Sequence, residues 1–173
     1  MTVFIALLRA VNVSGTGKLP MADLRAMCEA LGFVHVRTYI ASGNVLFESA
    51  LSEAVVKAAL EARLTEYAGK AVPVFVRNAT EMKAVLVADP FPDAHGSRHL
   101  VYFLDAAPPA DTIETIRGQA EERIALGVRE IYVDYGAGIR FTKLKIPRNI
   151  IGTARNMNTV AKLATMASSK GGG

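Results

Sequence analysis

The segment VFIALL at residues 3–8 constrains the fold more than any other stretch of this chain. Its consecutive residues are apolar and partly β-branched, so both faces of a strand formed there would carry side chains that avoid water. Such a strand needs cover on both faces. We therefore expect residues 3–8 to form a central strand of a sheet, with later segments as its neighbours and its cover.

The segments that follow predict a β-α-β-β-α-β order over residues 1–78. Apolar residues at helical spacing, glycines after the last apolar residue and a Ser at a capping position mark two helices, and runs rich in Val, Tyr and Phe mark the strands. The predicted elements are a helix from Pro20 to Gly32, strands at 34–40 and 44–48 joined by a turn with Gly43, a helix from Ser52 to Gly69, and a strand at 72–76. This order is that of the split βαβ, or ferredoxin-like, unit.

The second half predicts a related but shorter set of elements. Residues 79–97 should hold a short helix and a linker, because DPFPDAHGS at 89–97 is rich in Pro, Gly and Asp. Residues 98–167 predict β-α-β-β-α, which repeats the first half without its last strand, and residues 168–173 predict a disordered tail. The elements are a strand at 99–104, a helix at 109–126, a hairpin of strands at 130–135 and 138–144, and a final helix. The expected fold is α+β, with two ferredoxin-like subdomains, the second incomplete, ending in a C-terminal helix.

Charge is distributed unevenly along the chain. The formal net charge is +4, yet residues 1–134 carry 13 Lys and Arg against 16 Asp and Glu. After Asp134 the sequence has seven basic residues and no acidic one. Such asymmetry is typical of proteins with an anionic partner, such as a phosphate, a nucleotide or a nucleic acid, although a solvated basic face gives the same pattern.

The apolar runs and the cysteine content of the sequence indicate where the protein is located. Its longest apolar runs are far shorter than the roughly 20 residues that a membrane-spanning helix needs, and it does not open with a charged and apolar leader. A lone cysteine, Cys28, cannot form an internal disulfide. We expect a cytoplasmic protein that does not interact with membranes and is a monomer or a weak homo-oligomer.

Two glycine-containing segments of the first half are candidate ligand sites. VNVSGTGKLP follows the first strand and precedes the first helix, where backbone N–H groups can hold a phosphate. It is not a Walker A loop, because Leu19 follows Lys18 where that motif needs Ser or Thr. The turn TYIASGN places Ser42 and Asn44 at the end of a hairpin. Both segments are also explained by turn geometry alone.

Metal, cofactor and nucleophile chemistry lack a pattern in this sequence. His95 and His99 lie four residues apart with Asp93 nearby, but they span Gly96 and Ser97 at a junction between a loop and a strand, and a third ligand is not evident. Hydrolase, zinc-protease, dithiol and dinucleotide fingerprints are absent from the sequence. We therefore expect neither a metal nor a cofactor, and Cys28 should be a buried, inert thiol.

The segment TARNMNTVAKL at 153–163 is unusually polar. With Thr153 as N-cap and a helix from Ala154, its apolar residues share one face, and its polar residues share the opposite one. Arg155 would then lie near the positive end of the helix dipole, an unfavourable place for a cation unless an anion is close. A ligand-binding face and a solvated, capped face both remain open.

Several stretches resemble the bacterial domain-of-unknown-function family 1697. They are FIALLRAVNVSGTGKLPMADLR at 4–25, RTYIASGNVLFES at 37–49, HLVYFLDAAPP at 99–109, YVDYGAGIRFTKL at 132–144 and TARNMNTVAKL at 153–163. The resemblance implies a cytoplasmic α+β protein with a ferredoxin-like N-terminal half, and it implies no particular activity. The landmarks contain Arg9, Asn12, Gly15, Pro20, Ser42, Gly43, Asn44, Lys143, Arg155, Asn156 and Thr159.

The chain departs from the family pattern at two places. Met157 stands where the family usually has Trp, and the link from TKL to TARN is shorter than the resemblance implies. A stacking contact to a ligand would be weaker with Met, whereas Met is an adequate substitute in a core.

These observations lead to three hypotheses about function. The first is binding of a phosphate-bearing or other anionic ligand, a nucleotide or nucleic acid. The second is an enzyme acting on a small anionic substrate, with Lys143 or Arg155 stabilising charge, and the third is an oligomeric scaffold that uses apolar sheet faces. The candidate ligand-binding residues are Arg9, Asn12, Ser14, Gly15, Lys18, Ser42, Asn44, Lys143, Arg155, Asn156, Asn158, Thr159 and Lys162.

Overall fold

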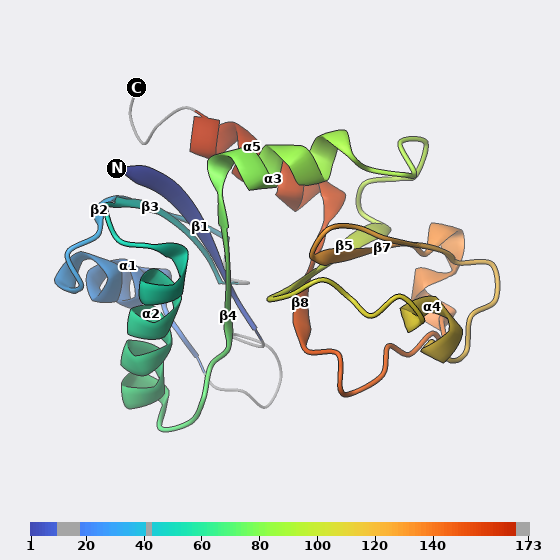
Figure 1. The fold of residues 1–173 in the computed structure, drawn as a ribbon, viewed down its shortest axis with the longest axis horizontal. Coiled ribbons are helices and arrows are strands. Elements are labelled where there is room, and N and C mark those ends of the chain that lie inside the picture. Colours follow the sequence, from blue (N-terminus) through green and yellow to red (C-terminus); the bar gives the residue numbers. More distant parts are fainter. Residues whose placement is uncertain (10–17, 41–42, 169–173) are drawn as a thin grey trace. The chain divides into compact units, whose positions relative to one another are not determined.

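The fold is described by a computed structural model that covers residues 1–9, 18–40 and 43–168 (Figure 1). Its contacts divide the chain into two units. Unit 1 comprises Met1–Met82 together with Leu163–Gly173, and unit 2 comprises Lys83–Lys162. The mixture of helices and antiparallel sheets confirms the predicted α+β class.

Unit 1 contains a four-stranded antiparallel sheet. Its strands are β1 (Thr2–Leu8), β2 (Val34–Tyr39), β3 (Asn44–Ser49) and β4 (Val74–Asn78), in the order β2-β3-β1-β4. β1 pairs with β3 on one side and with β4 on the other, and its last five residues are buried. The prediction of a central, doubly covered first strand is therefore confirmed.

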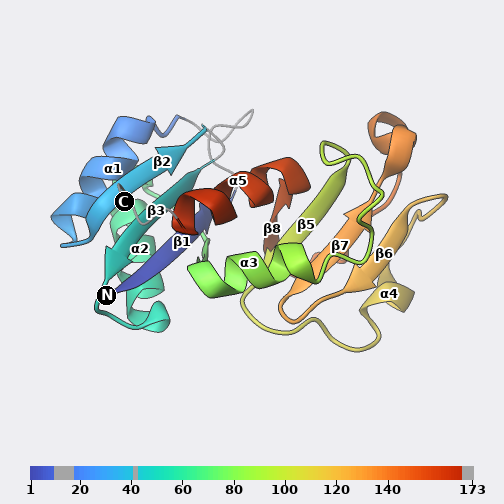
Figure 2. The ribbon, with the colours of Figure 1, turned by 90° about the horizontal axis from the view of Figure 1, so that it is seen from above.

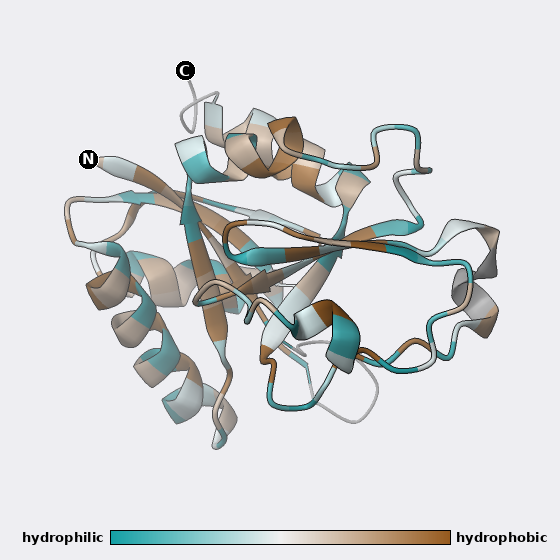
Figure 3. Cartoon of the chain, turned by 45° about the vertical axis from the view of Figure 1, so that its right-hand side comes forward, coloured by the Kyte–Doolittle hydropathy of each residue, from teal (hydrophilic) through white to brown (hydrophobic). Residues whose placement is uncertain are grey.

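Two helices cover one face of this sheet, and a third follows β4 (Figure 1). α1 (Met21–Ala30) and α2 (Glu53–Ala68) pack on the strands through one apolar cluster that includes Leu24 and Leu60. The Ser52 hydroxyl accepts a hydrogen bond from the Val55 N–H and so caps α2 as predicted. Figure 3 shows brown along much of β1 and β4, whereas α2 alternates between brown and teal. The third helix is α3 (Ala79–Val87).

Unit 2 contains a second four-stranded antiparallel sheet. Its strands are β5 (His99–Leu104), β6 (Arg123–Leu126), β7 (Glu130–Asp134) and β8 (Gly152–Asn156), in the order β6-β7-β5-β8 (Figure 2). Taken in chain order, the first, second, third and fourth strands occupy the same places here as in unit 1. The prediction that the second half lacks a fourth strand is wrong, because β8 fills that place beside β5.

The predicted helix at 109–126 is wrong. Only a single turn forms there, α4 (Thr112–Thr115), and the backbone is already extended at Ile116. Gly118 then has a φ of +73°, which is incompatible with a right-handed helix. Apolar spacing alone predicts a helix across a glycine that in fact breaks it.

The predicted strand at 138–144 is also wrong. Residues Gly136–Phe141 form a short 3-10 helix, η1, instead. β7 pairs with β5 on one side and β6 on the other, so neither edge of β7 is left for a further strand. The second half therefore has four strands, but its predicted long helix is reduced to α4.

The end of the chain differs from the prediction in its first residues. Thr153 is not an N-cap, because Gly152–Asn156 is a strand and the last helix, α5, begins at Met157 and runs to Ser168. Side chains at 153–156 alternate between buried and half-buried, which is the periodicity of a strand. A pattern of only five residues did not reveal this alternation, because Arg155 is a charged residue at a buried position.

The described part of the chain contains no helix long and apolar enough to cross a membrane.

One face of the second sheet has its own apolar cluster, formed by Leu104, Ile131, Val133 and Tyr135 and completed by Leu144 and Ile150 from the segment after η1. On the other face, the Tyr132 hydroxyl donates to the Val85 carbonyl at 2.8 Å. Irregular segments therefore help to cover this sheet where the sequence predicts a long helix.

Candidate functional site

Two candidate residues of unit 1, Arg9 and Asn44, lie at one end of its sheet. Asn44 opens β3 opposite Leu7 of β1, and its Nδ2 donates to the Tyr39 carbonyl at 2.9 Å. This side chain is fully buried and closes the β2–β3 hairpin, a role that needs no ligand. Arg9 directly follows β1 and is exposed, as is Lys18. Asn12, Ser14, Gly15 and Ser42 lie outside the described residues.

Arg155 lies on β8 in unit 2, opposite Val101 of β5. Its side chain is 7% exposed. Its Nη1 donates to the Thr153 hydroxyl at 2.8 Å and to the Ala154 carbonyl at 2.9 Å, and both acceptors are neutral. Burial lowers the pKa of the guanidinium to about 10. The arginine is thus a strand residue, and the helix dipole predicted to oppose its charge starts only at Met157.

Asn156 and Thr159 together form the start of α5. The Asn156 Oδ1 accepts a hydrogen bond from the Thr159 N–H at 2.9 Å, which is the geometry of an N-cap. The preceding turn at His95–Ser97 lies against the same helix start, since the Met157 N–H donates to the Gly96 carbonyl at 3.1 Å. Asn158 occupies the space beside Gly96, where an added Cβ would lie 2.1 Å from its Oδ1. Asn158 and Lys162 are exposed.

A second group of basic residues comes together in unit 2. Arg117 and Lys145 form an isolated antiparallel bridge in which each residue donates its N–H to the carbonyl of the other, at 3.1 and 2.8 Å. Residues directly opposite in such a pair direct their side chains to the same side. Both side chains are exposed. Two cations are therefore held side by side at the surface of this unit.

Gly118 makes this arrangement possible. Its backbone has a φ of +73°, and a Cβ added there would lie 2.0 Å from the Lys143 carbonyl oxygen. Only glycine has room for that approach. Lys143, Lys145 and Arg148 are exposed on the segment that passes Gly118. We call Arg117, Lys143, Lys145 and Arg148 the basic cluster.

Sequence reasoning identified only one member of the basic cluster as a candidate residue. Lys143 is a predicted ligand-binding residue, whereas Lys145 and Arg148 belong to the basic C-terminal region without being candidates themselves. Arg117 was missed because it fell within the predicted helix at 109–126. The available signal was Gly118, which interrupts that helical pattern.

The histidines at 95 and 99 have separate contacts. His95 Nδ1 lies 2.7 Å from the Ser97 hydroxyl, whereas His99 is buried with Nε2 2.6 Å from Asp89 Oδ1. The Nδ1 atom of His99 faces the Val133 carbonyl at 3.3 Å. Within residues 1–9, 18–40 and 43–168, no group of three or more His, Cys, Asp or Glu side chains is placed to hold a metal ion.

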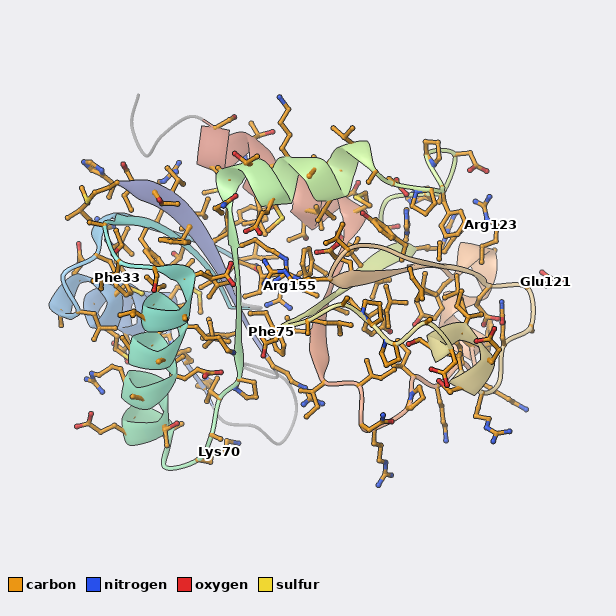
Figure 4. All side chains as sticks on the ribbon, viewed as in Figure 1. Phe33, Lys70, Phe75, Glu121, Arg123 and Arg155 are labelled. Carbon is orange, nitrogen blue, oxygen red and sulfur yellow. The ribbon has the colours of Figure 1, made fainter. Side chains whose placement is uncertain are left out.

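Carboxylates and an arginine gather near His99 on the same face of the sheet. Arg123, which is labelled in Figure 4, contacts both Asp93 and Asp134. Its guanidinium lies 4.6 Å from the centre of the Phe91 ring. These side chains neutralise one another and tie the 89–93 segment to the sheet. Their arrangement is that of a structural network, since the polar atoms are directed at each other.

The fold and these sites define a two-unit α+β protein with an exposed basic surface, a description that fits many biochemical roles. The chain belongs to the family described as protein of unknown function (DUF1697), whose model matches residues 1–132. The family resemblance seen in the sequence is therefore confirmed.

A solved structure agrees with this assignment. The chain is similar to the conserved bacterial protein SP0830 from Streptococcus pneumoniae, with 25% sequence identity and a TM-score of 0.81. The similarity covers 96% of this chain and 98% of the other. No curated protein matches the chain.

Proposed function

We propose that this protein binds a phosphate-bearing polyanion, with nucleic acid as the ligand class, through the basic cluster of unit 2. The observation that carries the proposal is the bridge between Arg117 and Lys145. Like charges directly opposite each other on paired strands are unfavourable. The repulsion between the two cations lowers the stability of the protein without a ligand. A phosphate placed between the two side chains would remove this repulsion.

The surroundings of the bridge favour the same ligand. Lys143 lies two residues before Lys145 on the segment that passes Gly118, and its exposed side chain adds a third cation close to the bridge along the chain. The nearby carboxylate of Glu122 is already engaged, because it accepts hydrogen bonds from the Thr142 hydroxyl and the Ala120 N–H. These bonds lower the pKa of Glu122. Glu122 thus supports the segment that carries the lysines.

The basic C-terminal region supplies the long-range part of the attraction. Basic residues without intervening acids raise the local concentration of an anionic ligand and speed its association. Phosphate contacts of this kind give affinity without sequence preference, so the protein should bind mixed sequences similarly.

The test is a binding titration with fluorescein-labelled mixed-sequence DNA and RNA, followed by anisotropy at increasing salt. Wild type should bind at low salt. Arg117→Gln and Lys145→Gln should each weaken binding for every sequence and lower the salt slope by about one. Lys83→Gln is the matched control, since Lys83 is an exposed cation of unit 2 on α3, outside the cluster.

Two results would contradict the proposal. One is the absence of binding to either nucleic acid at low salt. The other is an equal loss of affinity in Lys83→Gln and in the two cluster variants, which would mean that net charge alone, and not the bridge, determines binding.

A further inference from the structure

Unit 1 carries an open cleft at the edge of its sheet. The cleft has a volume of about 530 Å³, within the range of roughly 300 to 1,000 Å³ that is typical of small-molecule sites. It lies between α1 and β2, and β2 is the outermost strand in the order β2-β3-β1-β4. The lining residues are Arg25, Glu29, His35, Val36, Arg37 and Thr38.

A break in the strand pairing shapes this cleft. The register of β2 against β3 shifts between Val34 and Arg37, and His35 within the shift has a φ of +51°. A non-glycine residue in this region is uncommon, and bulges at sheet edges often redirect a side chain. His35 Nδ1 lies 2.5 Å from Glu48 Oε2, so that carboxylate orients the ring. Within the described residues, the second ring nitrogen, Nε2, has no hydrogen-bond partner, and it can donate a hydrogen bond only when the ring carries a proton on both nitrogens.

The cleft contains several hydrogen-bond donors and one carboxylate, that of Glu29. Arg25 is 59% exposed, and its Nε lies 3.6 Å from Glu29, a separation that leaves the guanidinium only loosely held. The hydroxyl of Thr38 and the imidazole of His35 come from the neighbouring strand. Arg37 adds a second positive charge, and its Nη2 donates to the Met166 carbonyl at 2.8 Å, which connects the end of α5 to this edge.

We propose that this cleft is a second ligand site, which binds a small organic oxyanion through Arg25, His35 and Thr38. The Arg25 guanidinium and the Thr38 hydroxyl donate to the acceptor oxygens of a phosphate or carboxylate group, and His35 Nε2 adds a third donor when the ring carries a proton on both nitrogens. The anion would replace Glu29 as the partner of Arg25. Because Glu29 competes with the ligand for that guanidinium, it lowers the affinity of the site for an anion.

This inference goes beyond the polyanion site and shares no residue with it. The basic cluster belongs to unit 2, whereas every lining residue of the cleft belongs to unit 1. Either site can therefore fail its test without affecting the other.

The test is a titration of the isotopically labelled full chain, followed by amide NMR at low ionic strength. The probes are inorganic phosphate, glycerol 3-phosphate and succinate, which separate a phosphate ligand from a carboxylate ligand. At least one probe should shift the amides of residues 35–38 in a saturable manner. Arg25→Gln should weaken that probe about five- to tenfold, consistent with the loss of one charged hydrogen bond at an exposed site.

Two further variants make the result specific. Glu29→Gln should strengthen binding, because it removes both the competitor for Arg25 and a repulsive charge. Arg63→Gln, on α2 of the same unit and outside the cleft, should leave the affinity unchanged. The proposal is overturned if none of the probes shifts residues 35–38, or if Arg63→Gln weakens binding as much as Arg25→Gln does.

Discussion

Arg123 of β6 and Asp134 of β7 face each other across the second sheet, and both Nε and Nη2 of the arginine donate to one carboxylate oxygen, at 2.9 and 2.6 Å. Nη2 also contacts Asp93. Burial acts to raise the pKa of Asp134, but the hydrogen bonds from Arg123 and from the Gly136 N–H outweigh it and hold the pKa below its ordinary value. The carboxylate therefore stabilises unit 2 in its charged form.

Asp134→Asn should lower the free energy of unfolding at neutral pH by about 1 kcal/mol, because it removes the charge that Arg123 and the Gly136 N–H hold. The folded pKa of Asp134 is depressed, so its contribution is present above the unfolded pKa and is lost as pH falls through the folded pKa. Urea unfolding followed by far-UV circular dichroism should thus show wild type and variant converging in acid.

Asp93→Asn is the control for this pair. Asp93 contacts the same guanidinium, but its side chain is 73% exposed, so its loss should cost less than the loss of Asp134. An offset between Asp134→Asn and wild type that stays constant down to the most acidic pH would show that the carboxylate charge is not what stabilises the unit.

Gly118→Ala should destabilise unit 2 and weaken binding to nucleic acid. The added Cβ would lie 2.0 Å from the Lys143 carbonyl oxygen, and the backbone conformation at this position also disfavours alanine. The free energy of unfolding should therefore fall by about 3 kcal/mol. Gly136→Ala is the matched control, since Gly136 has a φ of +57° and open space around its Cβ position. It should cost only the backbone strain, about 1 kcal/mol.

Equal stability losses in the two glycine variants would count against the close approach of the 117–118 and 143–145 segments. Denaturant unfolding measures the cost, and the anisotropy titration measures the effect on binding. Only Gly118→Ala should change both, because only Gly118 lies beside the basic cluster.

The first half of the chain was predictable because each of its signals is local. The apolar run of β1, the serine that caps α2 and the glycines at 32 and 69 each mark an element through a few adjacent residues. Gly43, at the β2–β3 turn, has the positive φ that its position in a hairpin suggests. Local propensity and tertiary structure agree in this half, so reading segments in order recovers the sheet and both helices.

The second half was harder because distant segments decide its local structure. Gly118 cannot continue a helix, because its backbone has a φ of +73° and lies against the carbonyl of Lys143, 25 positions later. Residues 152–156 form the strand β8 because they pair with the free edge of β5. The basic cluster depends on the same long-range contact. Neither the bridge between Arg117 and Lys145 nor the burial of Arg155 can be derived from the spacing of residues along the chain.

Asn156→Ala should lower the stability of the protein by about 1 kcal/mol, the usual cost of losing an N-cap. Asn158→Ala is the comparison, because Asn158 lies two residues into α5 and no cap is lost with it. Chemical unfolding of both variants should separate them clearly.

Asn156→Asp distinguishes capping from ligand binding at the same position. Aspartate also caps a helix and interacts well with its positive end, so stability should be retained. If Asn156 contacts an anionic ligand, as the sequence predicts, the added negative charge should weaken nucleic-acid binding while the helix stays intact. Unchanged affinity in Asn156→Asp would assign this residue to the helix cap alone.

Cys28 provides a probe of how unit 1 opens. The thiol is fully buried on α1, and burial, with a smaller effect of Glu29, raises its pKa to about 12. Because the thiolate is the reactive form, native protein should react with a disulfide reagent far more slowly than protein in urea. Labelling in the native state then requires α1 to leave the sheet, so its rate measures that local opening.

Leu24→Ala should accelerate the labelling of Cys28 by at least about tenfold, since deleting a buried leucine side chain costs roughly 2 to 5 kcal/mol and Leu24 packs in the same apolar cluster. Arg25→Gln is the control on the same helix, because Arg25 is exposed and its loss should leave the labelling rate unchanged. Rapid labelling of the wild-type thiol without denaturant would contradict this description of α1. It would mean that the helix separates from the sheet readily, and the cleft between α1 and β2 would then form only part of the time.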